Sequence, residues 1–287
     1  MNKELIDLID KYSKKGHFYT SYPTEANWSN DFSAQNYIDA LKEFSETNES
    51  TALYAHYPFC NSKCLYCLCR ADVVANDEKV KEFLHYNTKE IEILKNVFNS
   101  LNNRIRIKEI HLGGGSPTSM KIDRFKEYLD SISRIVDFSE LEEFNLEIDP
   151  RTVDEKKLRE YHSLGVNRIS FGIQDFNPDV QKAVNRIQPF NKIKELLNEE
   201  LRRDYKSINF DLICGLPMQT IKSFARTIEQ VIELSPDRVC LYTYVHKPSA
   251  YPIQQAIDEK QIPRLDEKLD MIVNASNELI DAGYIQI

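Results

Sequence analysis

The chain has 287 residues, which suits two ordinary domains or one large α/β barrel and is too long for a small scaffold held by disulfides. Hydrophobic residues make up 41% and charged residues 29%, and these globular proportions exclude a collagen-like or low-complexity chain. The formal net charge is −8 and no basic block is interleaved with aromatics, which argues against nucleic acid as a main partner.

The N-terminal 50 residues differ from the rest of the chain. The opening stretch MNKELIDLIDKY carries acidic residues where a secretory signal needs a continuous apolar segment, and no run of 18 apolar residues follows it. We therefore expect a soluble, cytoplasmic protein with no membrane span. Two short helical patterns flank the turn-rich segment YTSYPT at residues 19–24, and we predict an N-terminal extension over residues 1–50.

Beyond the extension, short β-type runs alternate with longer helical periods, which is typical of βα units and a parallel sheet. Residues 122–136 and 220–234 carry apolar residues at helical spacing, and residues 266–282 are a predicted last helix before a strand-like stub at 284–287. We therefore predict an α/β fold with six βα units. The predicted strands are 52–57, 107–112, 143–148, 168–173, 208–213 and 238–244.

Several predicted strands carry polar residues on one face, because alternate residues of a strand point to opposite sides. Glu147 opposes the apolar residues of the strand at 143–148, and Asp211 opposes those of the strand at 208–213. In a barrel the apolar residues would pack under helices and the polar ones would meet in a common interior. The alternative is solvent exposure in an antiparallel sheet, which the intervening helices disfavour. The pattern predicts a ligand site in a polar interior.

Four of the six cysteines lie directly after the first predicted strand, at Cys60, Cys64, Cys67 and Cys69. In a reducing compartment, clustered thiols indicate a metal site rather than disulfides. The C-x3-C-x2-C spacing of Cys60, Cys64 and Cys67 would leave one iron of a [4Fe–4S] cluster open to chelate S-adenosylmethionine (SAM), and it is the signature of radical SAM proteins. The alternative is one zinc ion held by all four thiolates, including Cys69.

Three consecutive glycines, Gly113, Gly114 and Gly115, follow the second predicted strand and indicate a close approach of the backbone to a ligand. The run lacks the spacing of a dinucleotide-binding fingerprint, so the interpretation rests on its position. Tyr66, directly before the third cysteine, is a candidate to cover the adenine of this ligand. The alternative is an ordinary exposed loop tyrosine.

With these motifs, the chain from about residue 19 to residue 287 resembles the oxygen-independent coproporphyrinogen III oxidases (coproporphyrinogen dehydrogenases), radical SAM enzymes of haem biosynthesis. The resemblance is carried by YTSYPT, LYAHYPFC with the cysteines after it, GGGSPT, EIDPR, GIQDFN with VNR, and DLICGLP. It implies a partial (β/α)6 TIM-type barrel as the radical SAM domain over residues 51–287. Cys69 fits the oxidases better than the related haem chaperones.

The resemblance also implies the cofactors and their residues. The three cysteines of the C-x3-C-x2-C motif would hold a [4Fe–4S] cluster, and two SAM molecules would bind in the interior. Tyr54 and Gly114 would contact the first SAM, and Glu147 would hydrogen-bond to it, which agrees with its predicted interior side. The residues implied around the second SAM are Tyr66, Gly115, Ser116, Gln174, Arg186, Asp211 and Val245.

Some of these residues have ordinary explanations when each is taken alone. Gln174 could be a surface amide, Arg186 a solvated arginine at a helix end and Val245 simple strand packing, although the spacing match favours the functional roles. His56 shares the predicted face of Tyr54, where it could assist catalysis at the substrate site. A hydrogen-bonded core histidine is the alternative.

The chain departs from the family pattern at several points. Ser116 replaces the usual threonine, Leu68 stands where glycine is usual, and Val245 replaces a smaller alanine. Family members continue into a C-terminal domain that is absent here, so we expect a truncated catalytic domain.

The implied activity is the oxidative decarboxylation of two propionate groups of a tetrapyrrole. A 5′-deoxyadenosyl radical from SAM would abstract hydrogen from each propionate, and loss of carbon dioxide and one electron would leave a vinyl group. This would convert coproporphyrinogen III to protoporphyrinogen IX. We expect an electron donor protein as partner and a monomeric chain. The alternatives are a haem-binding chaperone and a radical SAM methyltransferase on the same barrel.

Overall fold

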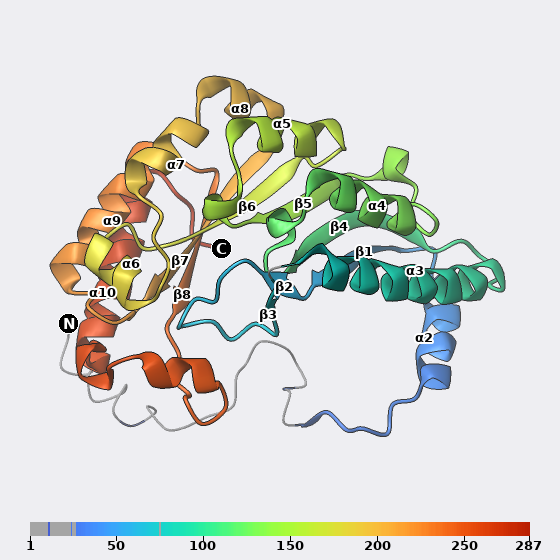
Figure 1. The fold of residues 1–287 in the computed structure, drawn as a ribbon, viewed down its shortest axis with the longest axis horizontal. Helices are drawn as coiled ribbons and strands as arrows, with labels where there is room; N and C mark the ends of the chain where they lie inside the picture. The colour runs from blue at the N-terminus through green and yellow to red at the C-terminus, as the bar shows by residue number, and fades with distance from the viewer. Residues whose placement is uncertain (1–10, 12–23, 25–26, 75) are drawn as a thin grey trace. The chain divides into compact units, whose positions relative to one another are not determined.

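The structure is a computed structural model that describes residues 11, 24, 27–74 and 76–287 (Figure 1). It divides into two compact units, one with the described residues up to Glu49 and Asn96–Ile105, the other with Ser50–Lys95 and Arg106–Ile287. The predicted division into an extension at 1–50 and a barrel domain at 51–287 stays a prediction. Except for Thr24, the YTSYPT segment lies outside the described residues.

In the first unit, helix α2 (Ala34–Glu46) coincides with the second helical pattern predicted in the extension. Ser33 and Asn36 form a capping box, in which the Ser33 hydroxyl accepts a hydrogen bond from the Asn36 backbone and the Asn36 side chain accepts one from the Ser33 backbone. This arrangement satisfies backbone N–H groups that the first turn leaves without partners. The first helical pattern of the extension lies outside the described residues.

In the second unit, six parallel strands form one sheet in the order β1-β4-β5-β6-β7-β8. All six predicted strands are present, which confirms the α/β fold class. A separate pair of two-residue strands, β2 (Phe59–Cys60) and β3 (Asp72–Val73), braces the cysteine loop and was not predicted. The six strands of the sheet are β1 (Ser50–Tyr57), β4 (Arg106–Gly114), β5 (Glu143–Ile148), β6 (Arg168–Gln174), β7 (Ser207–Cys214) and β8 (Arg238–Thr243).

Helices connect these strands, and Figure 1 shows α4, α5 and α9 along the outer side of the sheet. The helix predicted at 122–136 ends at Ile132, whereas those predicted at 220–234 and 266–282 agree with α9 and α10. Among the described helices, none is long and apolar enough to cross a membrane. Their bounds are α3 (Asp77–Asn99), α4 (Ile122–Ile132), α5 (Glu155–Ser163), α6 (Pro178–Ala183), α7 (Phe190–Leu196), α8 (Glu199–Asp204), α9 (Ile221–Leu234) and α10 (Leu265–Asp281).

The core lies between the sheet and these outer helices. Burial alternates along β5 and β7, where Phe144, Leu146, Phe210 and Leu212 are fully buried and the residues between them are only partly buried. This alternation confirms the predicted separation of apolar and polar faces. Burying the apolar face provides most of the driving force for this packing, at about 25 cal/mol per Å² of apolar surface.

The strand-like stub predicted at 284–287 is wrong, because those residues form no strand in the structure. Tyr284 donates its hydroxyl to the carbonyl of Pro236 at 2.7 Å, and Ile285 and Ile287 are exposed. A β-type sequence without a pairing partner gains no ladder of hydrogen bonds, so local composition alone did not determine a strand.

Candidate functional site

The cysteine loop leaves the carboxyl end of β1 and is held at several points along its length. Within the loop, the backbone N–H of Cys67 donates to the carbonyl of Cys64 at 3.2 Å, and Lys63 Nζ donates to the carbonyl of Ala71 at 2.9 Å. Cys64 is buried, Cys60 and Cys67 are partly buried, and Cys69 is exposed. The motif cysteines therefore occupy a braced turn.

The motif thiols differ in acidity. Hydrogen bonds from the side chain and backbone of Cys69 outweigh burial and lower the pKa of Cys67 to about 6. Burial, with the neighbouring thiols, raises the pKa of Cys60 to about 12. A thiolate is the form that binds metal, so Cys67 is favoured as a metal ligand near neutral pH. Cys69 contributes by donating hydrogen bonds to Cys67.

Two arginines reach the sulfur of Cys64. Arg151 Nη2 and Arg186 Nη1 each lie 3.4 Å from Cys64 Sγ. Asp149 joins them, with its Oδ2 at 2.7 Å from Arg151 Nη2 and 3.4 Å from Arg186 Nη1. Burial alone would raise the pKa of Asp149, but Arg186 and Arg151 hold it at about 2. This buried group of three ions gives the cysteine loop a fixed positive charge beside one sulfur.

These residues fit a [4Fe–4S] cluster better than a single zinc ion. Three cysteines on one short loop suit a cluster, which is negatively charged with its thiolates and is stabilised by donors to sulfur. A structural zinc site usually takes its four ligands as two pairs, whereas these cysteines lie in one short loop.

Strand register brings a second set of polar residues together on the interior face. Tyr54 on β1 pairs in register with His111 on β4, and His111 pairs with Asn145 on β5. Glu147 follows two residues later on the same face of β5. The rings of Tyr54 and His111 lie 5.6 Å apart, centroid to centroid. Neighbouring parallel strands in register present such residues side by side.

Glu147 is the carboxylate at the centre of this set. Its Oε1 lies 2.8 Å from His111 Nε2, and its Oε2 accepts a hydrogen bond from the Gly114 backbone at 3.2 Å. Asn145 Nδ2 donates to His111 Nδ1 at 2.9 Å, so Nδ1 is the acceptor and Nε2 carries the proton that is donated to Glu147. Sequence reasoning missed His111. The signal that could have found it is its position two residues before the glycine run, on the same strand face as Tyr54 and Glu147 in their own strands.

Two of the glycines are required by this geometry. A Cβ at Gly113 would lie 2.4 Å from Glu147 Oε1. At Gly114, where φ is +109°, a Cβ would lie 2.6 Å from the His56 ring. A Cβ at either position would displace the Glu147 carboxylate or the His56 ring, and the φ value at Gly114 favours glycine. Part of the predicted close approach is therefore to the protein's own side chains.

Tyr54 and His56 form a hydrogen-bonded pair at the carboxyl end of β1. His56 Nε2 lies 3.0 Å from the carbonyl of Arg70, which can only accept, so Nε2 is the donor. His56 Nδ1 then accepts from the Tyr54 hydroxyl at 3.0 Å. His56 is exposed, so the alternative of a core histidine is wrong.

The residues predicted around a second SAM fall into separate places. Asp211 lines an interior cavity of about 280 Å³ together with Glu147, and burial raises its pKa. Arg186 is 7% exposed, so the alternative of a solvated arginine is wrong. Tyr66 is partly buried against an apolar cluster and not an exposed loop residue.

The remaining predicted residues do not converge on that cavity. Ser116 is buried, with its hydroxyl 3.4 Å from that of Thr118. Gln174 is partly buried at the end of β6, and Val245 is partly buried two residues after the end of β8. Gly115 donates its backbone N–H to the carbonyl of Tyr57. Their roles stay predictions.

The radical SAM superfamily model matches residues 54–231 of this chain. The chain is 38% identical to the oxygen-independent coproporphyrinogen III oxidase of Helicobacter pylori strain 26695, over 98% of this chain and 62% of that protein. It is 35% identical to the protein of the same name from Escherichia coli K12, over 97% of this chain and 60% of that protein.

Among solved structures, the chain is similar to coproporphyrinogen III oxidase (HemN) from Escherichia coli, titled a radical SAM enzyme. The TM-score is 0.87 at 33% identity, covering 98% of this chain and 62% of that one. Streptococcus suis SuiB, at 13% identity and a TM-score of 0.52 over 98% of this chain and 58% of that one, shares the fold. The chain thus spans about three fifths of the relatives described.

Proposed function

The chain belongs to the radical SAM superfamily, and we propose that it carries the catalytic barrel of an oxygen-independent coproporphyrinogen III oxidase. Membership implies a [4Fe–4S] cluster and SAM. The proposed oxidoreductase reaction converts two propionate groups of coproporphyrinogen III to vinyl groups in haem biosynthesis. The similarity to coproporphyrinogen III oxidases over 98% of this chain carries the proposal.

Cys60, Cys64 and Cys67 would hold the cluster. When bound, the reduced cluster and SAM supply a carbon-centred radical that takes one hydrogen atom from a propionate. The substrate then loses carbon dioxide and one electron to an acceptor, which leaves the vinyl group. The protein's own part is to position the cofactors and to exclude water.

The interior residues would orient the first SAM. Glu147 keeps acceptor capacity after its bonds to His111 and Gly114, because a carboxylate offers about four lone-pair sites. Its negative charge suits a ligand amine or hydroxyl. Glu147 lies close enough to the cysteine loop to act electrostatically on Cys69. Tyr54 and His56 would line the side on which the substrate approaches.

A second SAM is part of the proposal, and Asp211, Arg186 and Tyr66 are among the residues that the resemblance implies for it. The proposed enzyme is a cytoplasmic monomer that takes its electron from a donor protein. We infer the tetrapyrrole substrate from the similar proteins, which are named coproporphyrinogen III oxidases.

An anaerobic assay of the reconstituted protein tests this function. With dithionite, SAM and coproporphyrinogen III, we expect 5′-deoxyadenosine together with decarboxylated porphyrinogen, detected by mass spectrometry. The Cys64→Ala variant should form neither product, whereas the control Cys214→Ala, at a buried cysteine outside the interior cavity, should form both. A methylated product would identify a methyltransferase instead, and tight haem binding without turnover would identify a chaperone.

A further inference from the structure

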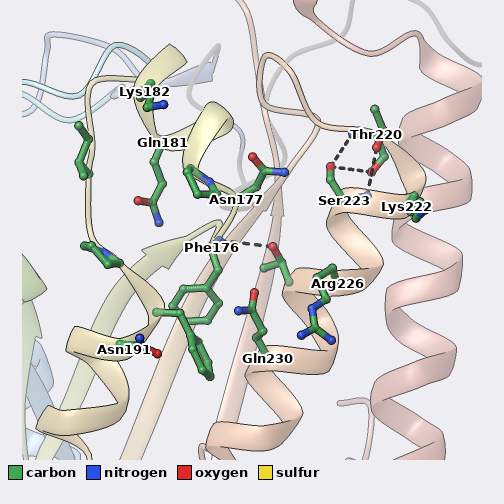
Figure 2. A pocket seen from close by; sticks show the side chains of 15 residues that line it. Phe176, Asn177, Gln181, Lys182, Asn191, Thr220, Lys222, Ser223, Arg226 and Gln230 are labelled. Carbon is green, nitrogen blue, oxygen red and sulfur yellow. Dashed lines mark hydrogen bonds between the residues drawn. The ribbon is translucent and has the colours of Figure 1, made fainter.

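A cavity of about 630 Å³ lies between helices α6 and α7 on one side and α9 on the other (Figure 2). It does not share its lining with the interior cavity described above. Part of its wall is apolar. Phe176 and Phe190 contribute two rings in edge-to-face contact, with centroids 5.1 Å apart. Ile187, which is 60% exposed, also lines this wall.

The charged side chains of this cavity are all cationic. Lys182 lies on α6, Lys222 and Arg226 lie on α9, and no Asp or Glu occurs among the described residues that line it. Two of these cations have carboxylates nearby on their own helices, Asp179 at 3.7 Å from Lys182 and Glu229 at 2.6 Å from Arg226. All four side chains are at least 59% exposed, so these pairs are weak and can exchange for a partner's carboxylates.

The same segment connects this cavity with the cysteine loop. Ile187 directly follows Arg186, whose guanidinium Nη1 donates to Cys64 Sγ at 3.4 Å. Three residues before Ile187, the carbonyl of Val184 accepts from the backbone of Leu65 at 3.0 Å. The exposed Ile187 is therefore linked to Cys64 through one residue, Arg186, and one hydrogen bond.

We propose that this cavity is the docking surface for an acidic one-electron carrier protein that reduces the cluster. The proposal rests on the proposed function, because the cluster must gain an electron from outside the chain. In each event the carrier is oxidised by one electron and the cluster is reduced by one, with no bond made or broken. The three lining cations attract an acidic partner, although the chain as a whole has a net charge of −8. The apolar wall contacts the carrier's surface around the carrier's redox centre.

The test compares two triple charge reversals in the reconstituted protein. The cavity variant reverses the three lining cations, Lys182→Glu, Lys222→Glu and Arg226→Glu. The control variant makes the same change of charge at exposed positions on α4, α5 and α8, Lys126→Glu, Lys156→Glu and Arg203→Glu. Cluster reduction is followed anaerobically by stopped-flow absorbance, with a reduced plant-type ferredoxin as the acidic carrier or with dithionite as a small reductant.

We expect the cavity variant to lower the rate constant with ferredoxin about tenfold or more at low ionic strength, and to flatten its dependence on salt. Dithionite should reduce this variant at the wild-type rate, and the control variant should match wild type with both donors. Equal rates for the two variants with ferredoxin, or a slower reaction with dithionite, would overturn the proposal. The reduction rates are measured without coproporphyrinogen III. A failure of the docking proposal can therefore be distinguished from a failure of the proposed activity, which the product assay reports.

Discussion

Two polar groups at the carboxyl ends of the strands differ in how completely their charges are satisfied. Asp149 pairs with both Arg151 and Arg186, and the three side chains are 9% to 19% exposed. Glu147 and His111 are also paired, but their side chains are 38% and 41% exposed. The first group is closed to solvent, although Arg186 Nε is buried without a hydrogen-bond partner, whereas the second group is open and keeps hydrogen-bonding capacity for a ligand.

This difference separates stability from binding. Removing one member of a buried ion group leaves an uncompensated charge in a low dielectric, so the variant has a lower free energy of unfolding. After removal of a half-exposed carboxylate, water can solvate the groups that it bonded, so the fold is little affected. The main loss is then in the affinity for the ligand. The comparison predicts that variants of the first group mainly change the unfolding free energy, and that variants of the second group mainly change the affinity for the first SAM.

The largest effect is expected from the three cysteines of the C-x3-C-x2-C motif, one of which contacts the first group. Cys60→Ala, Cys64→Ala and Cys67→Ala should each abolish the cluster, whereas wild type binds about four irons per chain after anaerobic reconstitution. Cys69→Ala should keep the cluster, because the predicted ligands are Cys60, Cys64 and Cys67, and Cys69 donates hydrogen bonds to Cys67. Iron analysis and visible spectra measure this. One metal ion per chain, or loss of iron in Cys69→Ala alone, would contradict the assignment.

The next effect concerns the closed group. Arg186→Gln should lower the unfolding free energy by about 3 kcal/mol, because Asp149 loses one of its two cationic partners in a buried site. Denaturant unfolding of the cluster-free protein measures the change. The matched control is Arg203→Gln, which breaks an exposed pair with Glu199 and should change the unfolding free energy by less than about 0.5 kcal/mol. Equal losses in the two variants would refute the distinction.

A smaller effect is expected at the open group. Glu147→Gln should weaken SAM binding about tenfold to a hundredfold, because it removes a charge-assisted hydrogen bond of roughly 1.5 to 3 kcal/mol. Folding and iron content should be unchanged, and 5′-deoxyadenosine formed after dithionite reduction should fall. Normal cleavage by the variant would exclude the proposed role. Loss of the fold or of the cluster would identify Glu147 as a structural carboxylate.

The smallest effect is expected at His111. His111→Phe removes the Nε2–H that holds Glu147, and we expect SAM affinity to fall about twofold to tenfold, equivalent to the usual net value of one hydrogen bond. His111→Gln keeps an N–H donor and should restore part of the affinity. Equilibrium dialysis of labelled SAM against both reconstituted variants measures the difference. Equal affinities for the two variants would show that the donated hydrogen bond is not what matters.

The strands and their polar faces were predictable from sequence, because alternation and apolar periods report directly on burial. The cysteine motif was also evident, since ligand spacing along one loop is a local property. Five helices were not predicted individually: α3, α5, α6, α7 and α8. For α6, α7 and α8, six or seven residues give too short a period to detect, but length does not explain why the 23-residue α3 was missed.

Long-range contacts account for what the sequence could not predict. His111 matters because strand register places it between Asn145 and Glu147, which lie 34 and 36 residues further along the chain. Arg151 lies within the EIDPR segment, yet its contact with Cys64 spans 87 residues. Such pairings depend on how the elements pack, which no local pattern reports.

The most direct test of the account is electron paramagnetic resonance of the reduced, reconstituted protein before and after addition of SAM. If three cysteines hold the cluster and leave one iron open beside Glu147, SAM should change the spectrum of the reduced cluster, and Glu147→Gln should need a higher SAM concentration for the same change. An identical spectrum with and without saturating SAM would contradict the central claim.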